Sequence, residues 1–151
     1  MFPLTMSSDM TLKEMKNRVD FCLNRVDLKS VNQLFPSQLS GGMQKRVAIA
    51  RAIALNPKYL FCDEPNSGLD PSTATVIDNL LKEITYEYNI TTVINTHDMN
   101  SAMEIGDNII FIKEGRKEWE GNSDNLLQSD NNYLNDFIFS SRLFKKLKRL
   151  I

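Results

Sequence analysis

Two adjacent glycines at the start of an expected helix constrain this 151-residue chain more than any other feature. Residues 39–46 are Leu-Ser-Gly-Gly-Met-Gln-Lys-Arg, and an alanine-rich segment follows, so we expect a helix over about residues 42–55. Ser40 has the position of an N-cap, and the glycines leave backbone N–H groups accessible where a Cβ would crowd a ligand. A helix start attracts negative charge through these groups and its dipole. The pattern predicts either a capped helix after a glycine turn or an anion site.

An acidic pair follows the next apolar segment. Tyr59–Cys62 is short, apolar and partly aromatic, which favours a strand buried on both faces of a parallel sheet. Asp63 and Glu64 come at its carboxyl end, where open α/β sheets bind their ligands. Asp63 suits Mg²⁺, a hard cation that prefers oxygen ligands, and Glu64 suits a water-activating role in attack on a γ-phosphate. Two solvated carboxylates are the alternative.

The remaining pattern predicts an α/β fold with parallel strands and flanking helices. Thr11 and Glu14 form a capping box before a helix, and Pro71 begins another helix after the loop 66–70. That second helix carries apolar residues on one face, namely Val76, Ile77, Leu80, Leu81 and Ile84. The segment 91–95 is β-branched and predicts a second core strand, and a short helix capped by Asp98 follows it. Segments 108–113 and 117–120 predict a hairpin.

Composition excludes several classes of protein. With 42% apolar and 25% charged residues, the chain is typical of a soluble globular domain. A net charge of −1 provides no overall attraction to nucleic acid. Cys22 and Cys62 lie in apolar patterns and predict buried free thiols in a reducing compartment, and one histidine with two separated cysteines makes a zinc site improbable. The sequence has neither a membrane-spanning apolar run nor a secretory signal.

Four motifs together resemble those of ABC transporter ATPases, in the same order and at similar separations. The stretch 39–46 resembles the family's signature motif, and the strand before Asp63-Glu64-Pro65 resembles Walker B with its catalytic glutamate. The segment 67–70 resembles the D-loop, and His97 occupies the place of the switch histidine. The resemblance covers about residues 1–125. It implies a partial P-loop NTPase (ABC ATPase) fold with a mostly parallel sheet, flanking helices, part of a helical subdomain, and a C-terminal hairpin plus helices.

The resemblance also implies a division of the chain and a role for each motif. Residues 1–56 correspond to the helical subdomain with the signature, 57–125 to the core with Walker B, D-loop and H-loop, and 126–151 to a C-terminal helical extension. ATP and Mg²⁺ are the implied cofactors, with Asp63 binding Mg²⁺ directly or through water and with Glu64 and His97 as catalytic residues. The residues implied to contact a nucleotide held by another subunit are Ser40, Gly41, Gly42 and Gln44. Those implied at the subunit interface are Ser67, Gly68, Leu69 and Asp70.

The phosphate-binding loop of the family, G-x-x-x-x-G-K-S/T, does not occur in this sequence, whose first glycine is Gly41. Gln33 and Gln38 do not have the context of the family's Q-loop. We therefore interpret the chain as the C-terminal part of a nucleotide-binding domain, from a truncated gene, a split gene or a mis-called start. In that interpretation, the absent neighbouring strand leaves an apolar sheet edge exposed.

Two classes of function follow from the resemblance. The first is an ATP-hydrolysing subunit at the cytoplasmic face of the inner membrane, with a permease and a second ATPase subunit as partners. Residues 62–70 and 95–99 most resemble Mla-type ATPases, which implies phospholipid transport. The alternative is a non-catalytic module that docks on a permease or a full-length ATPase through residues 1–38, with Phe2, Leu4 and Met6 as contacts. The basic stretch 142–149 predicts a packed closing helix or a helix on an anionic membrane surface.

Without a phosphate-binding loop, the isolated chain is expected to show no ATPase activity. Phosphate release by the purified chain measures this, with Glu64→Gln as the control. Turnover above background that Glu64→Gln abolishes would contradict the expectation.

Overall fold

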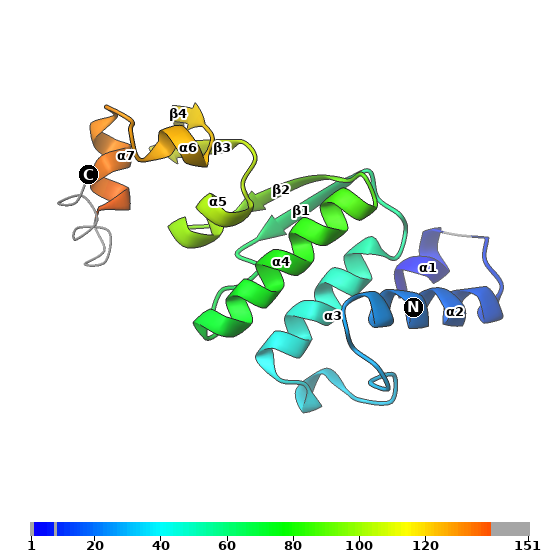
Figure 1. Ribbon diagram of the computed structural model, residues 1–151. Coiled ribbons are helices and arrows are strands. Elements are labelled where there is room, and N and C mark those ends of the chain that lie inside the picture. The colour runs from blue at the N-terminus through cyan, green and yellow to red at the C-terminus, as the bar shows by residue number, and fades with distance from the viewer. Residues whose placement is uncertain (1, 8, 140–151) are drawn as a thin grey trace. The chain divides into compact units, whose positions relative to one another are not determined.

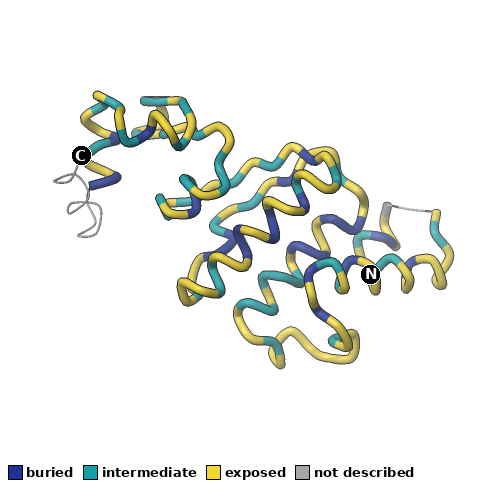
Figure 2. The backbone as a smooth tube through the Cα atoms, in the orientation of Figure 1, coloured by how far each residue is buried: buried dark blue, intermediate teal, exposed yellow. Residues whose placement is uncertain are grey.

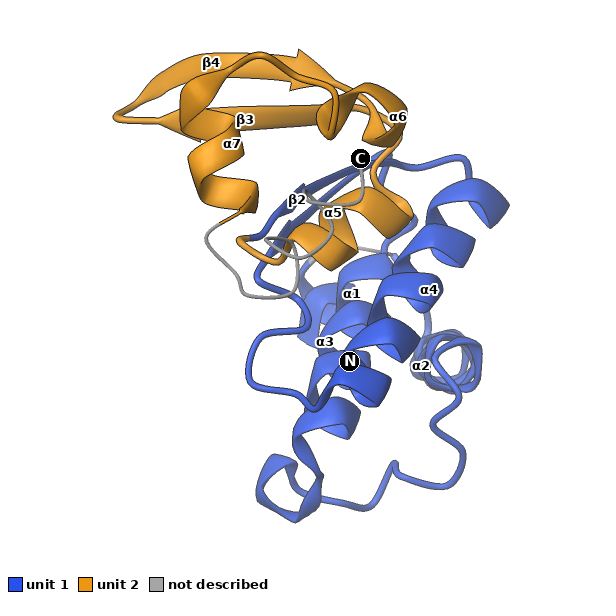
Figure 3. Cartoon of the chain, turned by 60° about the vertical axis from the view of Figure 1, so that its left-hand side comes forward, with its two compact units in different colours: residues 1–96 blue, residues 97–151 orange. Residues whose placement is uncertain are grey.

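The computed structural model describes residues 2–7 and 9–139, and the chain divides into two compact units, residues 1–96 and 97–151 (Figure 3). Each unit is described by itself. Within the described residues, no helix is both long enough and apolar enough to cross a lipid bilayer.

The first unit contains five α-helical or 3₁₀ segments and two strands (Figure 1). In chain order they are α1 Phe2–Ser7, α2 Leu12–Arg25, η1 Pro36–Gln38, α3 Gly41–Ile53, β1 Tyr59–Asp63, α4 Pro71–Glu87 and β2 Thr91–Asn95. The side chains of Thr11, Ser40 and Asp70 cap α2, α3 and α4, each accepting a hydrogen bond from the third residue of its helix. These caps confirm the helix starts that the sequence predicts.

The two strands of the first unit are parallel, and α4 connects them. Their register pairs Tyr59 with Thr91 at one end and Asp63 with Asn95 at the other. This confirms the strand, helix and strand order that the sequence predicts. The register also places the carboxyl ends of both strands side by side, directly before the loops that carry the candidate site.

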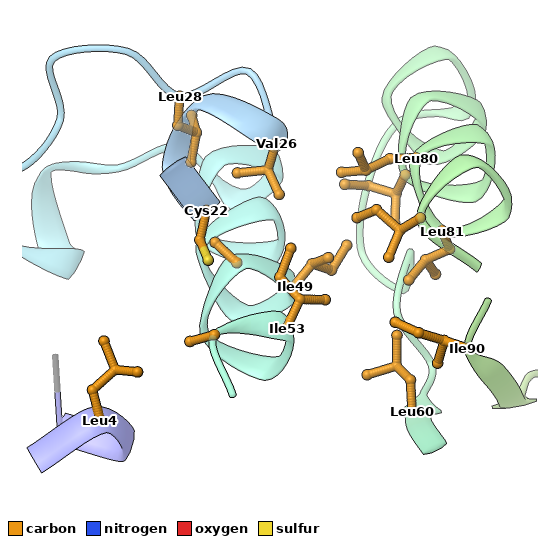
Figure 4. Packing of buried hydrophobic residues seen from close by; sticks show 14 of the residues in the cluster. Leu4, Cys22, Val26, Leu28, Ile49, Ile53, Leu60, Leu80, Leu81 and Ile90 are labelled. Atoms are coloured by element: carbon orange, nitrogen blue, oxygen red, sulfur yellow. The ribbon is translucent and has the colours of Figure 1, made fainter. Parts of the chain in front are cut away.

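The core of the first unit lies between α2, α3, α4 and β1, and α1 adds Leu4 to it. The side chains of Ile77, Leu81 and Ile84 on α4 are fully buried, and they share one apolar cluster with Ile53 of α3 and Leu60 of β1. Figure 4 shows Leu81, Ile53 and Leu60 in this cluster. Figure 2 shows that the buried stretches of this unit lie mainly along its helices, whereas the strands carry few buried residues. Helix packing therefore positions the strand ends.

Two expectations about burial are wrong. The strand β1 is not buried on both faces. Leu60 and Cys62 pack toward the helices, whereas Phe61, on the other face, is 75% exposed opposite the half-exposed Val93. Among the described residues, β1 pairs with β2 alone, so its other edge is unpaired, and Tyr59 on the same face as Phe61 is 64% exposed. Leu4 is not an exposed contact either, since α1 packs that side chain completely into the core while Phe2 and Met6 remain exposed.

One residue on α4 also departs from the predicted apolar face. Val76 is 53% exposed, whereas the neighbouring Asp78 is buried at 3% exposure. The buried carboxylate accepts hydrogen bonds from Asn66, which replaces an apolar contact with a polar one on the inner face of the helix.

The second unit is built around an antiparallel hairpin of β3 Ile109–Lys113 and β4 Arg116–Gly121. Glu114 and Gly115 both have positive φ at its two-residue turn, as a type I′ hairpin requires, so the predicted hairpin is confirmed. The helices are α5 Met99–Ile105, α6 Ser123–Leu126 and α7 Asn132–Ile138, and the core side chains are Leu126, Leu134, Ile138 and Phe139. The basic stretch 142–149 lies outside the described residues.

The unequal burial of β1 predicts unequal effects of substitution. Leu60→Ala should lower the free energy of unfolding by about 2–5 kcal/mol, because it leaves a cavity in the core. Phe61→Ser should change it by less than about 0.5 kcal/mol, because that ring is mostly in solvent. Urea unfolding followed by circular dichroism measures both. Similar losses for the two variants would show that the second face of the sheet is covered.

Candidate functional site

The glycine turn at the start of α3 has the geometry that an anion site needs. Ser40 is extended, and its Oγ accepts a hydrogen bond of 3.3 Å from the Met43 N–H. The Gln44 N–H donates to the Ser40 carbonyl at 2.9 Å and so begins the helical pattern. The N–H groups of Gly41 and Gly42 precede that first bond and therefore point out of the end of a 13-residue helix.

The Gln44 side chain supports the segment that leads into this turn. Its Nε2 donates to the carbonyl oxygens of Pro36 and Leu39, both at 3.1 Å. In this conformation the amide nitrogen faces its own chain, so the structure shows a supporting contact. A contact between Gln44 and a nucleotide stays a prediction.

The two glycines also bring the signature turn against the loop that follows β1. A Cβ on Gly42 would lie 2.7 Å from Thr73 Cγ2 in the first turn of α4, a separation too short for real carbon atoms. A Cβ on Gly41 would lie 3.4 Å from Leu69 Cδ2, which is an ordinary contact. Close packing of the two helix starts is therefore a second reason for glycine at position 42, besides any ligand.

The acidic pair lies at the carboxyl end of β1, as predicted. The exposed Asp63 carboxylate accepts a 2.7 Å hydrogen bond at Oδ1 from the Asn95 amide. Glu64 has a φ of 46°, a left-handed conformation that costs a non-glycine residue about 1–2 kcal/mol. Its N–H donates to the Asn95 carbonyl at 2.9 Å, and its own carbonyl accepts from Lys45 Nζ at 3.0 Å. The helix α3 and the strand β2 thus both hold the strained residue.

The segment 67–70 forms a tight turn that ends in the cap of α4. Gly68 has a φ of 77°, and Asp70 accepts hydrogen bonds from Ser72 Oγ and from the Thr73 hydroxyl and N–H. These hydrogen bonds, that from Ser72 first, hold the pKa of the Asp70 carboxyl well below its usual value. The cap therefore keeps its charge into acid solution, and its stabilising effect is lost only as the pH falls through this lowered pKa.

A buried polar pair anchors the same loop to α4. Asn66, 6% exposed, donates from Nδ2 to both carboxylate oxygens of Asp78 at 3.2 and 3.1 Å. The supporting roles of Asp78, Asn95 and Lys45 could not be predicted from the sequence. The only available signal for Asp78 was a charged residue beside the apolar face of a helix, and the contacts of the other two are too distant in sequence to be inferred.

His97 is the first residue of the second unit, two positions after the end of β2. Its side chain is exposed, and the following residue, Asp98, caps α5 as predicted. His97 therefore follows shortly after the strand end that carries Asn95. Its catalytic role stays a prediction.

The first unit therefore brings the candidate anion turn, the acidic pair and the segment 67–70 into one packed region. No cluster of three or more acidic, histidine or cysteine side chains suited to a metal occurs in the described parts of the chain. Asp63 still fits Mg²⁺, because nucleotide sites hold that ion with one or two carboxylates together with phosphate oxygens and water. The carboxylate is exposed, and its amide partner is neutral and leaves its charge in place.

Residues 2–67 match the ABC transporter family. The methionine import ATP-binding protein MetN 1 of Acinetobacter baylyi is 48% identical over 102 residues, which cover 68% of this chain and 29% of the relative. The corresponding MetN 1 of Bacillus licheniformis is 47% identical over 103 residues, which cover 68% of this chain and 31% of the relative.

Two solved structures have the same fold. MJ0796, a bacterial ABC transporter cassette solved as a dimer, is 39% identical with a TM-score of 0.70, covering 81% of this chain and 53% of that one. CbiO1 of Clostridium perfringens, part of the ABC transporter complex cbiONQ, is 31% identical with a TM-score of 0.77, covering 95% and 57%. The predicted partial ABC ATPase fold, with a parallel and an antiparallel strand pair, is confirmed.

The chain spans about 30% of the length of these curated relatives and about half of these solved cassettes. Both curated relatives are methionine import proteins, so the narrower resemblance to Mla-type phospholipid ATPases is not supported. The reason is that residues 62–70 and 95–99 belong to the candidate ATP machinery, whose motifs are shared between systems with different cargo.

The close contact at Gly42 gives a prediction of unusual sign. Alanine for glycine normally stabilises a helix, by up to about 1 kcal/mol. Gly42→Ala should instead lower the free energy of unfolding, because Thr73 is held through its hydroxyl by Asp70 and its methyl group lacks room to move. Urea unfolding measures the change.

Two further variants make this prediction specific. Thr73→Ser removes the methyl group and keeps the hydroxyl, so Gly42→Ala should be neutral or stabilising in that background. Gly41→Ala, which meets Leu69 at an ordinary distance, should be tolerated. A loss for Gly42→Ala that persists beside Thr73→Ser would refute the packing explanation.

Proposed function

We propose that this chain, which is part of an ABC transporter ATP-binding domain, provides the signature side of an ATP site. A second ATPase subunit shares this site. The observation that carries the proposal is the capped diglycine turn of α3, whose first N–H groups point out of the helix end. A phosphate at such a helix start gains hydrogen bonds from these groups and a favourable interaction with the helix dipole. ABC cassettes bind adenine nucleotides, as the MJ0796 cassette with ADP and Pi illustrates.

In this proposal the remaining motifs have separate tasks. Asp63 holds Mg²⁺ and Glu64 orients a water for attack on the γ-phosphate, together with His97. These three residues act beside a phosphate-binding loop, which the present sequence does not contain. Residues 67–70 form part of the subunit interface, and their packing against the signature turn within one unit supports a shared role.

The cargo that we propose is methionine. A permease takes it up through the membrane, and the ATPase subunit binds that permease at the cytoplasmic side. The support is the 48% identity with a methionine import protein over 102 residues. The only support for phospholipid transport is the resemblance of residues 62–70 and 95–99, which belong to the ATP-handling motifs. The choice of partner subunit can distinguish between these two.

A second candidate function is a docking module without catalysis, and one pocket favours it. An open cavity of about 640 Å³ lies between α2, α3 and the segment 31–39. Its lining is largely apolar, with Val19, Leu23, Val31, Leu39 and Val47, and Lys16, Asp20 and Arg51 add charges to it. A helix of a permease with one apolar face fits a pocket of this kind.

The affinity of a partner subunit for ATP tests the leading proposal. The partner is a full-length methionine import ATPase that carries glutamine in place of its catalytic glutamate, so that ATP is not consumed. Addition of the present chain should lower the Kd for Mg-ATP by roughly fivefold or more, because the signature turn then contacts the bound phosphates. A fluorescent ATP analogue reports the Kd. An unchanged Kd in a mixture that forms the complex would contradict the proposal.

Charge variants at helix starts provide matched controls. Gly41→Asp should abolish the effect by repelling phosphate, although an acidic residue in a first helical turn favours the helix itself. Asn132→Asp adds the same charge to the first residue of α7 and should leave the effect intact.

The choice of partner tests the cargo. The Kd of an Mla-type ATPase for Mg-ATP should not change when the present chain is added. If it responds equally, methionine import is overturned while the shared ATP site stands.

A further inference from the structure

Asn95 is in contact with both members of the acidic pair. Its side-chain amide donates to Asp63 Oδ1 at 2.7 Å, and its backbone carbonyl accepts the Glu64 N–H at 2.9 Å. Asn95 therefore joins β2 to the two residues that the proposed function places nearest to the reaction.

The register of the sheet explains why this position can do so. Asp63 and Asn95 are direct partners in the parallel pair, at the last residue of each strand. Side chains in register on neighbouring strands leave the same face of a sheet, so a short amide reaches a short carboxylate there. The side chain of Ile94 leaves the other face and packs against the core.

The chemistry of the donor suits a carboxylate that binds a cation. A lysine at position 95 would neutralise Asp63 and compete with a metal for it. A neutral amide binds one oxygen, restricts rotation of the side chain and leaves the negative charge available. Partners that orient a ligating group in this way strengthen metal binding without contacting the metal.

We propose that Asn95 is a positioning residue, which fixes the rotamer of Asp63 for Mg-ATP and holds the Glu64 backbone beside it. The proposal rests on the cation role of Asp63 in the proposed function. A second asparagine and carboxylate pair serves as an internal comparison, because Asn108 Nδ2 donates to Glu120 Oε1 at 3.2 Å on the hairpin of the other unit.

The full 151-residue chain, labelled with ¹³C and ¹⁵N, allows the test by NMR. Three-bond couplings report the χ1 angle of Asp63, which should occupy one rotamer in the wild type and average over several in Asn95→Ala. Mn²⁺ added as its chloride should broaden the Asp63 amide signal, and Asn95→Ala should raise the Mn²⁺ concentration for half-broadening roughly tenfold. Asn108→Ala should leave both readouts at Asp63 unchanged.

The exchanged pair Asp63→Asn with Asn95→Asp distinguishes positioning from simple stability. It retains one amide and one carboxylate in contact, so Mn²⁺ broadening at this strand end should return to within about threefold of wild type. Asp63→Asn alone should lose it. Recovery in the exchanged pair supports the inference even if Asn95→Ala folds poorly.

The possible failures are distinguishable. If the wild type shows no Mn²⁺ broadening at Asp63 either with or without ATP, the cation role in the proposed function fails and the inference falls with it. If the wild type binds Mn²⁺ and Asn95→Ala retains both the single rotamer and the same half-broadening concentration, the positioning role alone is overturned.

Discussion

The close approach of two helix starts holds the candidate site together. At Gly42 the backbone of α3 passes so near to α4 that a Cβ would lie 2.7 Å from Thr73 Cγ2. Thr73 is itself held by Asp70, the cap of α4. The signature turn and the segment 67–70 therefore occupy fixed positions relative to each other within residues 1–96. Glycine at position 42 serves this internal packing as well as any ligand.

The acidic pair depends on contacts from two different elements. Glu64 adopts a left-handed conformation, and such strain persists only where the surrounding structure enforces it. Asn95 from β2 and Lys45 from α3 bind the N–H and the carbonyl of this residue. Because Lys45 lies three residues after Gly42, one helix both presents the candidate phosphate-binding turn and supports the candidate catalytic glutamate.

Much of the fold could be predicted from local patterns, because caps and strand signals act over a few residues. Ser40, Asp70 and the order of β1, α4 and β2 are examples. Burial could not be predicted in the same way, since the apolar run of β1 has one face toward the helices and leaves Phe61 on the other face 75% exposed. For the candidate site, the sequence predicted the motif residues and not the residues that support them. Its supports, Asn95 and the Asn66–Asp78 pair, depend on contacts across the sheet and between loop and helix.

The central claim is that the diglycine turn of α3 binds the terminal phosphate of ATP held by another subunit. A structure of the chain in complex with a full-length ATPase subunit, trapped with ATP, tests it directly. The account predicts Ser40 Oγ and the Gly42 N–H within about 3 Å of oxygens of the γ-phosphate. A complex in which this turn faces away from every nucleotide would contradict it.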